Sequence, residues 1–169
     1  MKYFNGFSLK GEEILFSKYL IDTKYSVAGF SYGAQQAFEY VYNNSARVDR
    51  LILLSPAFFQ NQKKSFIRTQ LKYFKIDKQK YIKQFLNNAK YPSTINLYNY
   101  LNIGTDKELE ELLYYIWDKQ KILELIKRGV NIEVFIGQKD KIVDASKSFD
   151  FFSNLTTTYL IKDSGHILT

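Results

Sequence analysis

The sequence predicts an α/β fold in which a helical lid is inserted into a mostly parallel sheet. Near both ends of the chain, short apolar runs alternate with segments of helical spacing, a pattern typical of parallel α/β sheets. The middle of the chain carries only helical patterns. We therefore expect residues 1–56 and 129–169 to form one α/β core, and residues 57–128 to form the inserted helical lid.

The composition narrows the class of protein. A chain of 169 residues, 46% of them hydrophobic, can bury a core of ordinary size. No apolar run approaches the ~20 residues of a membrane-spanning helix, and the first residues lack the pattern of a secretory signal. The absence of cysteine excludes disulfides, thiolate metal sites and cysteine nucleophiles. We expect a cytoplasmic monomer that does not bind membranes.

The N-terminal third of the chain is predicted to alternate strands and helices. Residues 2–5 form a short strand that ends before Gly6, and residues 11–20 form a helix. The side chains of this helix expected to face the core are Ile14, Leu15 and Tyr19. Residues 25–30 then form a buried strand.

A second helix and strand follow. From Tyr32 the apolar residues are spaced i, i+3, i+4 and i+7, which predicts a helix that ends at Asn43 and Asn44. Residues 50–54 form a strongly apolar strand, and Pro56 ends it. This order of elements is the β-α-β-α-β pattern of a parallel sheet.

The middle segment is predicted to be helical throughout. Two helical stripes cover residues 62–75 and 78–90, with most lysines on the opposite faces. Thr105 and Glu108 form a capping box, which begins a helix that runs through Trp117. Residues 121–128 add a short helix.

The alternation of strands and helices then resumes. Residues 131–137 are predicted to form a strand, residues 145–154 a helix and residues 157–161 a last strand.

Residues 29–33, Gly-Phe-Ser-Tyr-Gly, match the pattern G-x-S-x-G. A predicted strand precedes Ser31 and a predicted helix follows it, as a serine nucleophile on a strained turn requires. The flanking glycines allow the strand and the helix to approach closely. The N-terminus of the helix directs free N–H groups toward the serine, where an oxyanion would be stabilised.

A nucleophilic serine needs a base and an acid. The chain has one histidine, His166, which lies just after the last strand. Asp140 follows the strand over 131–137, where a loop can bring it to His166 to hold the imidazole tautomer. Asp144 is the alternative, and Asp163 has the position of a turn residue. The order Ser31, Asp140, His166 is that of α/β-hydrolases.

Taken in this order, these motifs resemble the α/β-hydrolase superfamily over nearly the whole chain. The resemblance implies a reduced α/β-hydrolase fold with Ser31, Asp140 and His166 as catalytic residues and with no cofactor or metal. Residues 5–7, Asn-Gly-Phe, match the family's oxyanion loop, with Asn in place of His. The implied oxyanion donors are the backbone N–H groups of Phe7 and Tyr32, although which N–H near Gly6 donates is left open.

Two features depart from the family pattern. The stretch between Phe7 and Ser31 has room for one helix and no further strand, so we expect a sheet trimmed at its N-terminal end. Only three residues follow His166, so the usual last helix is not expected.

The short length and basic lid resemble the pimeloyl-[acyl-carrier protein] methyl ester esterases of the BioV type, which act in biotin synthesis. Residues 60–90 hold nine basic side chains and one acidic side chain, in a chain of net charge +7. This resemblance implies an acidic acyl-carrier protein, carrying a pimeloyl methyl ester, as the partner. The expected docking residues are Arg68, Lys72, Lys75, Lys80 and Lys83. The expected apolar substrate wall is Phe58, Phe59 and Trp117.

Other functions stay open from the residues alone. A general esterase for small esters, or an acyl thioesterase, would use the same catalytic residues without depending on the lysines. A non-catalytic module that binds the acyl-carrier protein would keep only the scaffold. Nucleic-acid binding is not expected, because the aromatic residues of the basic stretch fall on the inward helical stripes.

Overall fold

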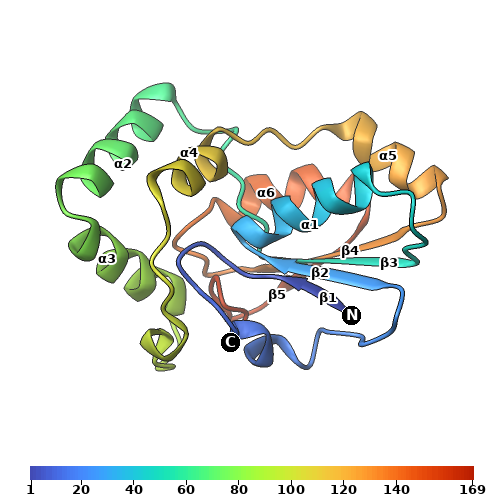
Figure 1. Ribbon diagram of the computed structural model, residues 1–169, viewed down its shortest axis with the longest axis horizontal. Helices are drawn as coiled ribbons and strands as arrows, with labels where there is room; N and C mark the ends of the chain where they lie inside the picture. Colours follow the sequence, from blue (N-terminus) through green and yellow to red (C-terminus); the bar gives the residue numbers. More distant parts are fainter.

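Five strands form one sheet, and their order in space follows their order in the sequence (Figure 1). The computed structural model describes residues 1–169. All neighbouring strands are parallel, which confirms the predicted α/β class. The strands are β1 (Lys2–Phe4), β2 (Ser26–Phe30), β3 (Arg50–Leu54), β4 (Asn131–Gly137) and β5 (Thr157–Ile161).

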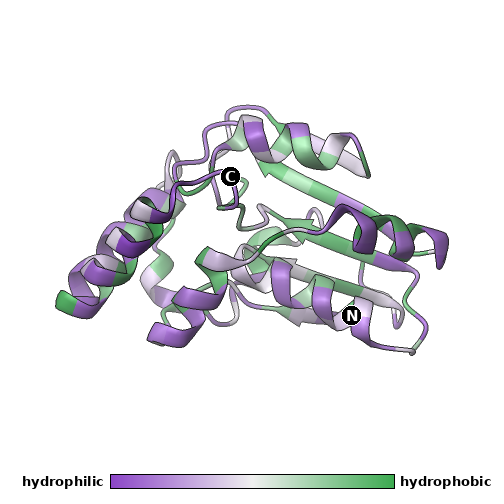
Figure 2. Ribbon diagram, turned by 90° about the horizontal axis from the view of Figure 1, so that it is seen from above, coloured by the Kyte–Doolittle hydropathy of each residue, from purple (hydrophilic) through white to green (hydrophobic).

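The central strands are apolar because both of their faces are covered, as is usual in parallel sheets. Every residue of β2 is buried, and only Arg50 of β3 is not. The register pairs Ala28 with Ile52, and Leu53 with Val134. Figure 2 shows the strands largely in the hydrophobic colour, whereas the helices alternate hydrophobic and hydrophilic residues along their length.

Helices cover the two faces of the sheet unequally. One face carries α1 (Tyr32–Asn43), α5 (Lys119–Lys127) and α6 (Ala145–Ser153) (Figure 1). The opposite face carries the short 3-10 helix η1 (Glu12–Phe16). Phe30 of β2 points to that face, where its ring lies 4.7 Å from the ring of Phe16.

The remaining helices lie between β3 and β4 in the sequence and stand at one end of the sheet (Figure 1). We call α2 (Lys64–Ile76), α3 (Lys78–Lys90), η2 (Leu97–Tyr100) and α4 (Asp106–Tyr114) the helical insertion. Within it, α2 packs against α3 and α4. In contrast, α5 packs against α1 as a crossover helix of the sheet layer. The division of the chain at residues 57 and 128 stays a prediction.

The predicted helix over residues 11–20 is wrong in type and in length, and one of its three predicted core residues is wrong. The structure has only the 3-10 turn η1, preceded by Gly11 at φ 75°. Leu15 and Tyr19 pack against the core as predicted, whereas Ile14 is 67% exposed and Phe16 is fully buried. A 3-10 helix has three residues per turn, so its inward positions differ from those of the predicted α-helix.

The predicted capping box is confirmed, but the helix that it begins is shorter than predicted. Thr105 Oγ accepts the Glu108 N–H at 3.2 Å, and Glu108 Oε2 accepts the Thr105 N–H at 2.6 Å. The helix stops at Tyr114 because Trp117 is held elsewhere. Its backbone N–H donates to Gln60 at 2.7 Å, and its indole N–H donates to the Ala57 carbonyl at 2.9 Å.

None of the helices combines the length and the hydrophobicity that a membrane-spanning segment requires.

Candidate active site

Ser31 occupies a strained turn between β2 and α1. Its φ of 55° and ψ of −113° lie where non-glycine residues cost roughly 1–3 kcal/mol. Hydrogen bonds hold this geometry: the Ser31 N–H donates to the Leu54 carbonyl at 2.9 Å, and its own carbonyl accepts the Ala57 N–H at 3.1 Å. The turn is therefore fixed by the neighbouring strand β3 and by the segment that follows it.

The two glycines of the motif permit the close approach that this turn needs. A Cβ on Gly29 would lie 2.1 Å from the Gly33 carbonyl oxygen, and a Cβ on Gly33 would lie 2.1 Å from the Phe4 carbonyl oxygen. Both distances are far below van der Waals contact, and both partners are backbone atoms. No other residue type fits at either position without moving β1 or α1.

Ser31, His166 and Asp140 form one hydrogen-bonded line. His166 Nε2 lies 2.9 Å from Ser31 Oγ, and His166 Nδ1 lies 2.6 Å from Asp140 Oδ2. The side chains of His166 and Asp140 are fully buried, and Ser31 is 1% exposed. The tautomer protonated at Nδ1 leaves Nε2 free to accept the serine proton. This arrangement can activate a serine oxygen as a nucleophile.

The structure decides between the candidate carboxylates. Besides its contact with His166, Asp140 accepts the N–H groups of Ile142 at 2.7 Å and Val143 at 3.1 Å, through Oδ1. Asp144, the alternative, is instead the N-cap of α6 and accepts the Lys147 N–H at 3.0 Å. Only Asp140 reaches the imidazole.

Asp163 is a turn residue, as predicted. It has a φ of 61° and pairs with Lys139 at 2.7 Å.

The His166 loop is anchored on the face of the sheet that carries η1. The imidazole packs against Phe30, with the ring centroids 5.0 Å apart. Beyond the histidine, the Leu168 N–H donates to the Gly165 carbonyl at 3.0 Å, and the Tyr19 hydroxyl donates to the Leu168 carbonyl at 3.0 Å. These contacts fix the ring so that its two nitrogens face Ser31 and Asp140.

The backbone N–H groups of Phe7, Ser8 and Tyr32 have no hydrogen-bond partner in the protein. Tyr32 follows Ser31 in the chain, and Phe7 lines the same cavity as Ser31. The Gly6 N–H, in contrast, donates to the Glu12 carboxylate at 2.7 Å. Gly6 therefore has no free donor, whereas Phe7 and Ser8 do, and the assignment of the Phe7 N–H to an oxyanion site stays a prediction. Free N–H groups placed in this way can stabilise an oxyanion on a carbonyl attacked by Ser31.

Ser31 lines a cavity of about 810 Å³ between the sheet and the helical insertion. Its volume lies within the range of small-molecule sites. The inner wall is apolar and buried, and consists of Phe7, Phe59, Leu109, Leu112 and Leu113. The outer wall, toward the α2–α3 turn, includes the exposed residues Tyr73, Ile76, Lys80 and Gln84. An extended, mostly apolar group therefore fits with its polar end toward the opening.

No protein-family model matches the sequence, and a search of curated proteins found no match. Solved structures do resemble it. The esterase from Exiguobacterium antarcticum has a TM-score of 0.64 and 18% identity, over 92% of this chain and 63% of its own. Bromoperoxidase from Bacillus anthracis has a TM-score of 0.68 and 14% identity, over 93% and 65%. BioG from Haemophilus influenzae has a TM-score of 0.60 and 9% identity, over 98% and 87%. The chain has the α/β-hydrolase fold.

This α/β-hydrolase fold is a reduced one. Only β1 precedes the strand that leads to the serine turn, as expected from the short stretch between Phe7 and Ser31. The chain spans 53% to 63% of the length of four esterase and hydrolase structures that it matches.

Of the three aromatic residues predicted to form the apolar substrate wall, one lines the cavity and two lie elsewhere. Phe59 lines the cavity, as expected. Phe58 instead packs against Phe151 at 5.3 Å, and Trp117 packs against Phe152 at 5.0 Å. Both side chains are buried beside α6, because the chain after β3 turns toward the helical face of the sheet before it reaches α2. Sequence analysis could not separate these neighbours, since all three residues are large and aromatic.

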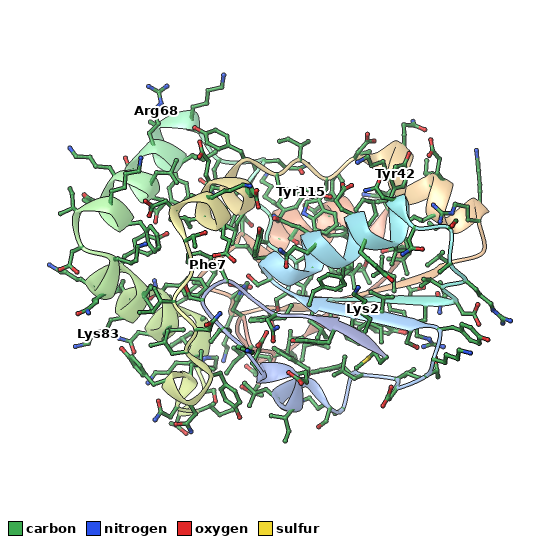
Figure 3. The ribbon with its side chains drawn as sticks, in the orientation of Figure 1. Lys2, Phe7, Tyr42, Arg68, Lys83 and Tyr115 are labelled. Carbon is green, nitrogen blue, oxygen red and sulfur yellow. The ribbon has the colours of Figure 1, made fainter.

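The predicted docking residues lie on α2 and α3 of the helical insertion. All are exposed, and none pairs with a carboxylate within 4.0 Å; they are Arg68, Lys72, Lys75, Lys80 and Lys83. Figure 3 shows Arg68 on α2 and Lys83 on α3 pointing away from the body of the protein. Their role in binding a partner remains a prediction.

No group of three or more histidine, aspartate or glutamate side chains is placed to hold a metal ion.

Sequence analysis missed two polar contacts that join α4 to the serine turn. The Tyr32 hydroxyl donates to Glu111 at 2.6 Å, and burial, followed by this contact with Glu111, raises the pKa of Tyr32. The buried Gln35 amide donates to the carbonyls of Ala57 at 3.0 Å and Leu112 at 3.1 Å. Helical periodicity gave no signal for either contact, because the partners are 22 to 79 residues apart.

Replacing Gly33 by alanine should destabilise the protein by at least about 2 kcal/mol, because the new methyl group would overlap the Phe4 carbonyl oxygen. Urea denaturation followed by circular dichroism measures this. The control is Gln36→Ala on the same helix, at an exposed position, which should change stability by less than about 0.5 kcal/mol. If Gly33→Ala unfolds at the wild-type midpoint, the close packing of β1 on α1 is not required.

Proposed function

We propose that this protein is a serine hydrolase of carboxylic esters. The observation that carries the proposal is the hydrogen-bonded line from Asp140 through His166 to Ser31, at a cavity with an apolar inner wall. A buried imidazole between a carboxylate and a serine hydroxyl has the geometry of a catalytic triad. The esterase structures that share the fold support the same reaction class.

In the first half of the proposed reaction, Ser31 Oγ attacks the ester carbonyl while His166 Nε2 accepts the serine proton. Asp140 stabilises the imidazolium that forms. The negative charge on the former carbonyl oxygen is stabilised by the N–H groups of Phe7 and Tyr32. His166 then gives its proton to the alkoxide that leaves, so the products are an alcohol and an acyl group bound to Ser31.

In the second half, water releases the acyl group. His166 Nε2 accepts a proton from the water as its oxygen attacks the acyl carbonyl, and the same N–H groups stabilise the second oxyanion. The bond to Ser31 Oγ breaks, and the proton returns to the serine. The free acid leaves and the site is restored.

As substrate we propose the methyl ester of a pimeloyl chain bound to an acidic acyl-carrier protein. The resemblance to short esterases of this type suggests it, and two features of the site support it. The cavity is deep and apolar enough for an unbranched acyl chain, with Ser31 at one side and the exposed wall of α2 and α3 at the other. Exposed basic side chains without a carboxylate partner lie on the same two helices, which suits an acidic partner.

Removing the nucleophile should abolish ester hydrolysis. Ser31→Ala is expected to lower kcat/KM at least ~10³-fold, because the remaining residues only bind the substrate and stabilise an oxyanion. The assay is the release of free acid and methanol from methyl-pimeloyl-carrier protein, with p-nitrophenyl butyrate as a second substrate. Circular dichroism serves as the control for folding. Near-wild-type turnover by this variant would rule out the proposed mechanism.

The two aspartates of the acid loop provide a matched pair. Asp140→Asn should lower kcat at least ~10³-fold, because the amide cannot hold the imidazole in the correct tautomer. Asp144→Asn should stay within about twofold of wild type, since asparagine is as good an N-cap as aspartate. The same two substrates are used. An Asp144→Asn variant with the larger loss would show that the acid has been assigned to the wrong residue.

The basic residues of the insertion should strengthen the binding of carrier-bound substrates and have no effect on small, free esters. Changing Arg68, Lys72, Lys75 and Lys83 to glutamate is expected to raise KM for the carrier-bound ester at least tenfold at low salt, because exposed charges act over a Debye length of about 10 Å at 0.1 M salt. Hydrolysis of p-nitrophenyl butyrate should keep its wild-type kcat. The control carries the same change in charge at exposed lysines elsewhere: Lys10, Lys127, Lys147 and Lys162.

Three outcomes separate the substrate classes. A loss confined to the carrier-bound ester supports docking on the insertion. No loss with either substrate indicates an esterase of small, free esters. A larger turnover of carrier thioesters than of the methyl ester would make the protein an acyl thioesterase that uses the same docking face.

A further inference from the structure

Glu12 is a buried carboxylate that the proposed mechanism does not yet use. Its side chain is fully buried at the start of η1. Oε1 accepts the Gly6 N–H at 2.7 Å and the Tyr3 hydroxyl at 3.3 Å, whereas Oε2 is buried without a partner. Burying a carboxylate without a cation is unfavourable for stability. An apolar side chain at this position would remove that cost but would leave the Gly6 N–H without its acceptor.

The partner of this carboxylate lies in the loop that carries the Phe7 N–H. Gly6 is held from both sides: its N–H donates to Glu12, and its carbonyl accepts the Leu9 N–H at 3.1 Å. The Gly6 carbonyl and the Phe7 N–H belong to one planar trans peptide and point in opposite directions. Fixing the carbonyl toward Leu9 therefore directs the Phe7 N–H away from Leu9.

The position of Gly6 is also restricted by the aromatic ring beneath it. A Cβ on Gly6 would lie 2.6 Å from the ring of Phe30, so the loop passes directly against this side chain. The same ring contacts the imidazole of His166. A shift of the Gly6 backbone would thus change both the direction of the Phe7 N–H and the packing beside the base.

We propose that Glu12 is a positioning residue for the oxyanion site: its carboxylate holds the Gly6 backbone so that the neighbouring Phe7 N–H faces the oxyanion. This inference rests on the proposed ester hydrolysis. It accounts for a fully buried acidic side chain with a single strong partner. Burial raises the pKa of Glu12, while the Gly6 N–H opposes that shift by stabilising the ionised form.

The decisive comparison is between Glu12→Met and Glu12→Gln. Methionine removes the buried charge but leaves the Gly6 N–H and the Tyr3 hydroxyl without their acceptor, so circular dichroism is used to check that the variant folds. Glutamine keeps an oxygen that can accept the Gly6 N–H. For p-nitrophenyl butyrate, Glu12→Met should lower kcat by about 10- to 100-fold with KM within twofold, since an oxyanion donor acts in the transition state. The kcat of Glu12→Gln should be at least tenfold higher than that of Glu12→Met.

The matched control is Glu13→Met, at the exposed neighbouring position, which should leave kcat and KM unchanged. If Glu12→Met fails to fold, Glu12→Asp takes its place, because the shorter side chain draws the Gly6 backbone inward. The expected result is a fall in kcat of about tenfold with KM unchanged. A wild-type kcat in the folded Met variant, or in Glu12→Asp, overturns the inference. Equal kcat in the Met and Gln variants overturns it as well.

The failure of this inference can be told apart from the failure of the proposed function. A fluorophosphonate probe reports the nucleophilicity of Ser31 without any natural substrate. If the wild-type protein neither reacts with the probe nor hydrolyses p-nitrophenyl butyrate, the proposed function fails and the role of Glu12 fails with it. If the wild type is active and Glu12→Met equals it in both assays, only the role of Glu12 is wrong.

Discussion

The close approach of β2 and α1 at Ser31 is the constraint on which the rest of the site depends. The serine has a positive φ, and that backbone geometry exists only because Gly29 and Gly33 let strand and helix nearly touch. The turn lifts the side chain off the carboxyl end of the sheet and leaves the first N–H of α1 unpaired. One strained residue therefore places the proposed nucleophile beside the free N–H that we propose as an oxyanion donor.

The parallel sheet supplies the remaining groups, because its strands all end at the same edge. Asp140 follows β4 and His166 follows β5, and both side chains are buried where these two loops meet. Each is held by contacts outside the catalytic line: Asp140 by two backbone N–H groups, and His166 by the ring of Phe30. Preorganisation of this kind limits the reorganisation needed during a reaction.

The helical insertion closes the site without supplying any of its reacting groups. It forms most of the cavity wall, and Gln35 and the Tyr32–Glu111 contact tie α4 to the serine turn. The outer helices α2 and α3 have no such polar ties to the turn and carry the basic side chains. The proposed chemistry and the proposed recognition of a partner are thus separated in space, which is why charge changes on the insertion can be distinguished from changes at Ser31, Asp140 and His166.

The sequence by itself determined the fold class and the serine, histidine and aspartate that meet in the structure. These features depend on local patterns: apolar strands, helical spacing and a glycine-flanked serine at a strand end. Short-range rules failed where a distant contact decided the outcome. Trp117 leaves its helix to reach Ala57, and the turn at Glu12 stays short.

Only the tertiary structure decided which residues line the cavity, and only it excluded Asp144, the alternative to Asp140, as the carboxylate beside His166. Phe58 and Phe59 are adjacent and chemically identical, yet only Phe59 faces the cavity. Asp140 and Asp144 lie in one loop, yet one binds the imidazole and the other caps a helix. The roles differ because they depend on which neighbours the folded chain brings within a few ångströms, and no pattern along the sequence encodes that.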